Sequence, residues 1–176
     1  SYFACETPQT TKSSLESMRT FATAIECIHL ASLVHDDIID DADTRRNVQS
    51  VPAMLGNDQA LVVGVYLYAQ ALDWVSRLGD PVLVQEMSHA VQRLCEGEHI
   101  QLIKRHQIFD DLDAYLHMIE GKTAALFASG LKMGAYLASA SQALQDAMYS
   151  YGLALGNIFQ MTDDLLDTYG KKADLG

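Results

Sequence analysis

Two rows of aspartates have the residue types and the spacing that could carry out chemistry. The first row is DDIIDD at residues 36–41, and the second is DDLLD at residues 163–167. On a helix, carboxylates four residues apart share a face, where like charges repel unless a cation is present. Proteins typically hold Mg²⁺ with one or two carboxylates together with substrate phosphates. One such row alone would more often be a solvated helix surface, but two rows predict helices that bind a diphosphate through magnesium.

Each aspartate row continues an apolar helical stripe, which indicates where the carboxylates should lie. Apolar residues recur every three or four positions from Met18 to Ile28 and from Val84 to Leu94. This spacing is typical of a helix face that is turned toward a core. Four stripes end in polar residues, namely Asp36 and Asp40, Glu98 and Gln101, Lys122, and finally Gln160, Asp163 and Asp167. The pattern predicts that these side chains converge inside one end of a helical bundle.

The elements expected to position these residues are all helices. We expect them over about residues 14–41, 58–77, 81–106, 110–138 and 141–169, the fourth beginning at Asp110 or Asp111. Asp80 followed by Pro81 is an N-cap with proline at the first helical position. Residues 43–57 are the most loop-like segment. No repeat or linker divides the chain, so we predict one all-α domain over residues 1–176.

The composition disfavours several other classes of protein. The chain has 12 Lys and Arg against 23 Asp and Glu, a formal net charge of −11, which argues against a nucleic-acid-binding protein. Its longest apolar stretch, residues 61–72, is interrupted by Gln70 and is too short to cross a bilayer. Three cysteines without a Cys-x-x-Cys pair suit a reducing compartment. Because residues 1–7 show no signal-peptide pattern, we expect a cytoplasmic protein that is not transmembrane.

The order and spacing of four motifs resemble those of the all-trans polyprenyl diphosphate synthases, which have the isoprenoid synthase fold. The motifs are LVHDDIID at 33–40 followed by Arg45 and Arg46, GEHIQ at 97–101, YLHMIEGKTA at 115–124, and GNIFQMTDDLLD at 156–167. Residues 28–37 are most similar to long-chain members such as hexa-, hepta- and octaprenyl diphosphate synthases. The resemblance implies an isoprenoid-synthase-type helical bundle. This chain would be a partial, central portion of it, because family chains extend further at both ends.

The resemblance implies a trans-prenyltransferase that makes a long-chain all-trans polyprenyl diphosphate. In this family an allylic diphosphate ionises, the double bond of isopentenyl diphosphate attacks the carbocation, and a proton is lost. Because charge separation forms the barrier, pre-placed electrostatics should supply most of the catalysis. Three Mg²⁺ ions are implied, which neutralise the leaving diphosphate as Lewis acids. Their expected ligands and supporting residues are Asp36, Asp37, Asp40, Asp163, Asp164 and Asp167.

Basic and polar residues are implied to bind the two substrates. Arg45 and Lys122 would bind the allylic diphosphate, and Arg46 would bind the isopentenyl diphosphate. Arginine suits phosphate because its planar fork donates two parallel hydrogen bonds. Dipoles of Lys122, Thr123 and Gln160 would be oriented toward the carbocation, which makes these three the expected catalytic residues.

The length of the product is expected to depend on residues about one turn before the first aspartate row. Ala31 and Ser32 are small, whereas short-chain relatives have an aromatic residue there that acts as a floor. We expect a tunnel that continues past them toward Ile28 and Ile25, unless the small residues only let helices pack closely. The resemblance also implies a homodimer, with product release at a membrane surface.

The chain departs from the family pattern at several positions. No Gly-Lys-Arg phosphate-binding element precedes Asp36, and the lysine usual after the second row is not reached by Gly176. Asn47 stands where a glycine is usual, and Val65 where an aspartate is common. We therefore expect the middle of a longer protein, since the isopentenyl site would otherwise be incomplete.

Two other interpretations remain open. Some long-chain synthases have two components, so the chain could be a catalytic-type subunit that is inactive alone. A ferritin-like di-iron carboxylate bundle is the other, because Glu26 with His29, and Glu96 with His99, have the required Glu-x-x-His spacing. That alternative leaves the aspartate rows unexplained.

Overall fold

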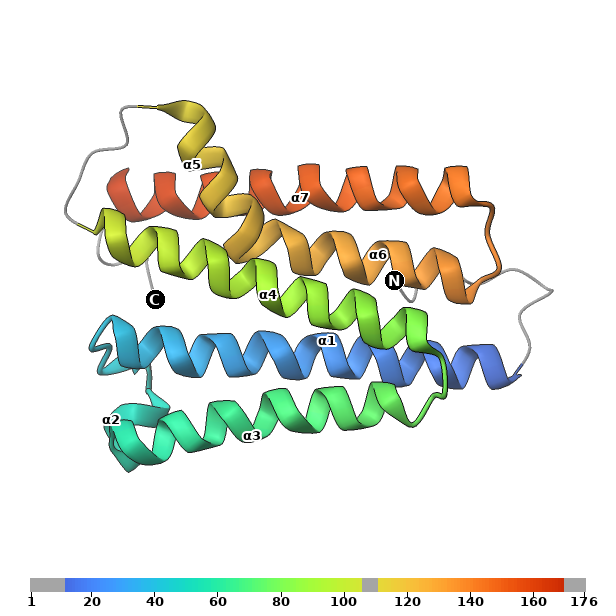
Figure 1. Cartoon of the computed structure of the whole chain (residues 1–176). Helices are drawn as coiled ribbons and strands as arrows, with labels where there is room; N and C mark the ends of the chain where they lie inside the picture. Colours follow the sequence, from blue (N-terminus) through green and yellow to red (C-terminus); the bar gives the residue numbers. More distant parts are fainter. Residues whose placement is uncertain (1–11, 106–110, 170–176) are drawn as a thin grey trace.

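The computed structural model describes residues 12–105 and 111–169, most of which are helical (Figure 1). Five long helices lie alongside one another: α1 (Lys12–Ile39), α3 (Asn57–Ser76), α4 (Pro81–Lys104), α6 (Ala125–Leu137) and α7 (Gln142–Tyr169). The shorter elements are β1 (Thr44–Arg45), β2 (Val48–Gln49), α2 (Val51–Leu55), α5 (Leu112–Ile119) and the π-helical turn η2 (Glu120–Ala124). No helix in the described ranges has the length and apolar character needed to span a membrane. The prediction of an all-α bundle is confirmed.

A hydrophobic core holds α1, α3, α4 and α6 together. Phe21 and Ile28 of α1, Val75 of α3, Met87 of α4 and Met133 of α6 are at most 1% exposed and belong to one packed cluster. Fully burying a side chain of this size contributes about 1.5–3 kcal/mol. The apolar stripes seen in the sequence therefore face the core, which fixes how the polar residues at their ends are presented.

Helix ends agree with the local signals in the sequence. The carboxylate of Asp80 accepts a hydrogen bond from the backbone N–H of Val82 at 2.9 Å, and Pro81 begins α4. Asp111 caps α5 in the same way by accepting from the N–H of Asp113 at 2.9 Å. A free N–H at a helix start is satisfied in each case.

The expected single helix over residues 110–138 is wrong in one respect. The π-turn η2 divides it into α5 and α6, and Figure 1 shows α5 turned away from the line of α6. A π-turn widens the helix by one residue and is often found at functional sites. Tertiary contacts rather than local residue preference impose this turn, so the helical periodicity did not predict it.

The loop-like segment contains a short hairpin. β1 and β2 pair antiparallel, with Arg45 opposite Val48. Between them, Arg46 and Asn47 have φ angles of 50° and 61°. A two-residue type I′ turn requires this left-handed conformation at both positions, and asparagine adopts it more readily than most residues. Asn47 can therefore replace the usual glycine without loss of the turn that returns Arg45 toward α1.

Candidate active site

The first aspartate row lies where α1 meets α4 and η2. Nζ of Lys122 is 2.8 Å from Oε2 of Glu98 on α4 and 3.7 Å from Oδ2 of Asp36 on α1. These three side chains are only 11–17% exposed. Oε2 of Glu98 is buried, and the ammonium group of Lys122 is the charged partner that balances it. Two carboxylates thus share one ammonium group, which leaves a negative charge in excess.

The electrostatics of this cluster favour an additional cation. Burial raises the pKa of Asp36 to about 6; the ammonium group of Lys122 opposes that rise, whereas the carboxylates of Glu98 and Asp40 add to it. A positive charge next to Asp36 would favour its ionised form. The cluster has the properties of a site that is more stable with a bound cation.

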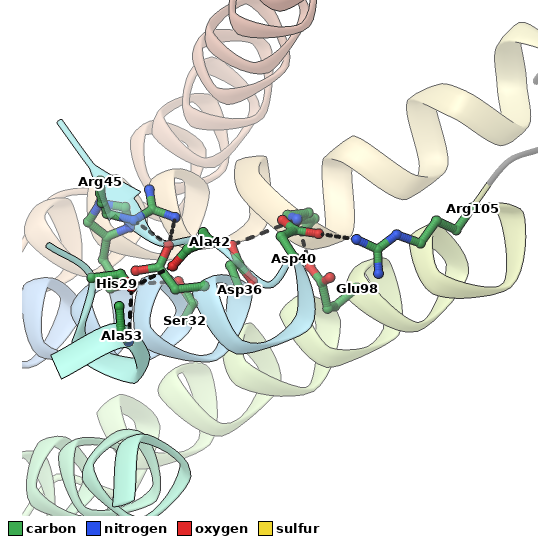
Figure 2. A network of polar contacts seen from close by, with 12 residues as sticks. His29, Ser32, Asp36, Asp40, Ala42, Arg45, Ala53, Glu98 and Arg105 are labelled. Carbon is green, nitrogen blue, oxygen red and sulfur yellow. Dashed lines mark hydrogen bonds and ion pairs between the residues drawn. The ribbon is translucent and has the colours of Figure 1, made fainter. Parts of the chain in front are cut away.

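Two more aspartates of the first row, Asp37 and Asp40, are each paired with an arginine. Asp37 is 4% exposed, and its Oδ1 accepts from Nε of Arg45 at 2.9 Å and from a terminal nitrogen at 2.8 Å. Asp40 is exposed and accepts from a terminal nitrogen of Arg105 at 2.9 Å (Figure 2). The other terminal nitrogen of Arg105 donates to the carbonyl of Ile39, also at 2.9 Å. Basic residues from three separate parts of the chain thus meet Asp36, Asp37 and Asp40.

Two glycines allow the backbone of η2 to lie against α4. A Cβ atom on Gly97 would meet the backbone nitrogen of Lys122 and would lie 2.8 Å from the carbonyl carbon of Gly121. A Cβ on Gly121 would lie 2.7 Å from the carbonyl oxygen of Arg93. Neither position has room for any side chain. This close approach brings Lys122 within reach of Glu98, its neighbour on α4.

Hydrogen bonds link the second aspartate row to the same π-turn. Oγ1 of Thr123 donates to Oε1 of Gln160 on α7 at 2.6 Å, and Nε2 of Gln160 donates to Oδ1 of Asp164 at 2.9 Å. Oδ2 of Asp164 accepts from the hydroxyl of Tyr115 on α5 at 2.5 Å. Because Lys122 and Thr123 are adjacent, successive side chains of η2 connect with the two different rows.

The donor set of the two rows fits magnesium held jointly with a phosphate. The rows lie toward the C-terminal ends of α1 and α7, at the same end of the bundle (Figure 1). Among the side chains that the structure describes, which do not include that of Asp167, no three His, Cys, Asp or Glu residues gather closely enough to hold a metal ion by themselves. Mg²⁺ needs few protein ligands when phosphates and water complete its coordination.

The remaining expected site residues differ in how deeply they are buried. Asp163 is exposed on α7, and the side chain of Asp167 falls outside the described part of the structure. Arg46 is exposed on the hairpin turn. The expected chain-length residues are buried on α1 below Asp36: Ile28 and Ala31 are 0% exposed and Ser32 is 8% exposed.

Two residues in the network had no role assigned from the sequence. Arg105 follows Lys104 at the end of α4, where basic residues often interact with helix C-termini. That rule predicts a capping role but not the contact with Asp40. Tyr115 lies within one of the motifs, yet nothing local indicates that it reaches Asp164 across 49 residues of sequence.

Comparison with known proteins finds relatives over almost the whole chain. The chain is 40% identical over 162 residues to "Heptaprenyl diphosphate synthase component 2" of Geobacillus stearothermophilus, covering 92% of this chain and 51% of that relative. It is similar to the crystal structure of octaprenyl pyrophosphate synthase from Helicobacter pylori, with a TM-score of 0.89 and 32% identity, covering 99% and 56% of the two chains. A polyprenyl synthase from Caulobacter crescentus CB15, complexed with calcium and isoprenyl diphosphate, gives a TM-score of 0.85 at 32% identity, with coverage of 93% and 53%.

These comparisons confirm the isoprenoid-synthase-type fold. The chain spans about half the length of the relatives it matches. They do not support the di-iron interpretation, and Glu26, Glu96 and His99 are all exposed. The family model described as "Polyprenyl synthetase" matches residues 1–176, the entire chain. The chain therefore belongs to the polyprenyl synthetase family.

Proposed function

We propose that this chain forms part of the active site of a trans-prenyltransferase. The reaction is head-to-tail condensation of an allylic diphosphate with isopentenyl diphosphate, which yields a long-chain all-trans polyprenyl diphosphate. The observation that supports this most directly is the link made by η2, where Lys122 contacts Asp36 of one row and Thr123 bonds to Gln160 beside the other. Membership of the polyprenyl synthetase family and the likeness to heptaprenyl and octaprenyl synthases support the same conclusion.

The proposed metal complement is three Mg²⁺ ions. When bound, they neutralise the charge on the leaving diphosphate. The proposed ligands are Asp36 of α1, Asp40 directly after α1 and Asp163 of α7. Asp37, Asp164 and Asp167 would support them. The chemistry of the donors supports this, since each is a carboxylate and Mg²⁺ prefers oxygen. The Caulobacter relative complexed with calcium and isoprenyl diphosphate pairs the same classes of ligand.

Basic residues of the chain would bind and orient the diphosphates. Arg45 uses two of its donors on Asp37, which leaves other guanidinium N–H groups for the allylic diphosphate. Lys122, already placed between two carboxylates, adds a positive charge near the same group. Arg46, exposed on the hairpin, would bind the isopentenyl diphosphate. Holding both substrates in register converts an encounter of two molecules into a reaction within one complex.

Thr123 and Gln160 would act at the reacting carbon. As the carbon–oxygen bond of the allylic diphosphate breaks, positive charge develops on the allyl group. Fixed oxygen dipoles stabilise such charge without having to reorganise. The double bond of isopentenyl diphosphate then forms the new carbon–carbon bond, and the departing pyrophosphate accepts the proton that is lost.

Product length and cellular setting complete the proposal. Ile28, Ala31 and Ser32 would border the tunnel for the growing chain, since they are buried on α1 below Asp36. The free thiols of Cys27 and Cys95 suit a reducing compartment such as the cytoplasm. The long apolar product would be released at a membrane surface.

A homodimer is proposed through the outward face of α3. Val62, Val65 and Tyr66 are 67%, 55% and 64% exposed there, an unusual amount of apolar surface for one helix. A second candidate is a catalytic-type subunit that needs a different partner chain. The likeness to a protein named component 2 of a heptaprenyl diphosphate synthase favours that alternative. Light scattering of the purified protein, alone and with candidate partners, distinguishes the two.

Product analysis tests the proposed activity. The full-length gene product would be incubated with farnesyl diphosphate, labelled isopentenyl diphosphate and Mg²⁺, with and without EDTA. We expect labelled long-chain products that disappear with EDTA and in the Asp36→Asn variant. Absence of elongation, with or without a partner subunit, would contradict the proposal.

A further inference from the structure

A hydrogen-bonded chain connects Tyr115 to Thr123 through two intervening side chains. The hydroxyl of Tyr115 lies 2.5 Å from Asp164, Asp164 lies 2.9 Å from the amide of Gln160, and that amide lies 2.6 Å from the hydroxyl of Thr123. All four side chains are partly buried. The chain thus ties α5 and the adjoining η2 to α7.

The direction of every hydrogen bond in this chain follows from the aspartate. An ionised carboxylate can only accept hydrogen bonds, so both Tyr115 and Gln160 must donate to Asp164. The Gln160 amide must then turn its NH₂ group toward Asp164 and its oxygen toward Thr123. An amide oxygen only accepts, so the Thr123 hydroxyl has to donate its hydrogen to it. Its own lone pairs then remain available to an electron-poor centre.

We infer that Tyr115 and Asp164 are positioning residues that set the orientation of the Gln160 amide and the Thr123 hydroxyl. This inference rests on the proposed prenyl transfer, in which Thr123 faces developing positive charge. A hydroxyl turned the other way would present its hydrogen to the carbocation and destabilise it. Asp164 uses one lone pair of each carboxylate oxygen within the chain, so it can orient Gln160 and still support a bound metal ion through the lone pairs that remain.

A double-mutant cycle tests whether Tyr115 acts through Thr123. In the full-length gene product, Tyr115→Phe removes one hydroxyl and is expected to lower kcat about tenfold, as loss of an outer hydrogen-bond partner often does. KM for both diphosphates should stay unchanged, because no phosphate-binding group is altered. In a Thr123→Val background, Tyr115→Phe should change kcat less than twofold, since the hydroxyl it orients is gone. Equal losses in both backgrounds would overturn the inference.

The matched control is Tyr136→Phe. Tyr136 donates to Asp80 at 2.9 Å, so it makes the same kind of bond away from the aspartate rows. We expect it to leave kcat unchanged. Binding of inorganic pyrophosphate with Mg²⁺, followed by calorimetry, should have the same magnesium dependence in Tyr115→Phe as in the wild type. A shift to higher magnesium concentration would mean that Tyr115 acts through the metal ions and not through Thr123, which would refute the inference.

A readout that needs no turnover separates this inference from the proposed function. The side-chain amide signal of Gln160 in a ¹H–¹⁵N spectrum, identified by its loss in Gln160→Met, should move in Tyr115→Phe and not in Tyr136→Phe. An unmoved signal refutes the orienting chain. If the wild-type protein elongates nothing while the Gln160 signal still moves in Tyr115→Phe, only the prenyltransferase proposal is refuted.

Discussion

Replacing Gly97 with alanine would push the π-turn away from α4. The new Cβ would lie 2.8 Å from two backbone atoms, the carbonyl carbon of Gly121 and Cα of Lys122, where ordinary contact begins at 3.4 Å. The backbone nitrogen of Lys122 would be closer still, so the backbone must retreat by more than 3.4 minus 2.8, or 0.6 Å. Overpacking typically costs about 1–3 kcal/mol. Because the clash is with backbone, no rotamer change relieves it, so we expect a loss of stability near the upper end of that range. The higher helix propensity of alanine offsets about 1 kcal/mol of this loss.

The net loss expected for Gly97→Ala is about 2 kcal/mol, which corresponds to a fall of about 4–8 °C in Tm for a chain of this size. Displacing η2 also separates Lys122 from Glu98, which are now 2.8 Å apart, so prenyl transfer should fall further than stability explains. Gly152→Ala is the matched control, because its Cβ would lie 2.5 Å from Cα of Ala128, on α6 beyond η2. It should lower Tm comparably but spare activity in the remaining folded protein. Wild-type Tm and activity in Gly97→Ala would refute the packing argument.

Four further predictions concern the site. Protonation of Asp36 should weaken Mg²⁺-dependent pyrophosphate binding below about pH 6, where its raised pKa lies; calorimetry across pH 5–8 measures this. The pKa of Asp36 is higher in the folded protein than in the unfolded chain. The free energy of unfolding of the wild type, compared with that of Asp36→Asn, should therefore fall as the pH rises from about 4 to about 6, which chemical denaturation measures. Ala31→Phe should shorten the polyprenyl product on reversed-phase chromatography, whereas Leu30→Phe, at a 46% exposed neighbour, should not; identical products would contradict the tunnel. Arg105→Ala should lower the free energy of unfolding by less than about 1 kcal/mol, because its ion pair with Asp40 is exposed. The same change should tighten Mn²⁺ binding measured by electron paramagnetic resonance, because it frees Asp40; weaker binding would contradict this.

The sequence was sufficient to predict the helices and the end of the bundle where polar groups gather. Apolar spacing located α1 and α7, and Asp80 with Pro81 located the start of α4, because both signals are local. The convergence of Lys122 and Asp36 at one end of the bundle also follows from apolar stripes that turn polar partway along each helix.

Contacts made through close packing could not be predicted in this way. The π-turn depends on backbone atoms of Gly97 and Gly121 meeting across two helices, which no periodicity encodes. Arg105 reaches Asp40 only because α4 ends beside α1. Both contacts depend on how far one helix is shifted along its axis relative to its neighbour, and packing across the whole core sets that shift.

The widened turn at η2 also has a consequence for sequence register. A π-turn takes up one residue more than a turn of α-helix does, so deleting one residue within Glu120–Ala124 would let α5 run into α6 as regular α-helix while α6 keeps its core face. The change would fall on η2 itself, because with one residue fewer Lys122 and Thr123 could not both keep the directions that carry them toward Asp36 and Gln160. Chimaeras between related synthases should accordingly have their junctions outside this segment.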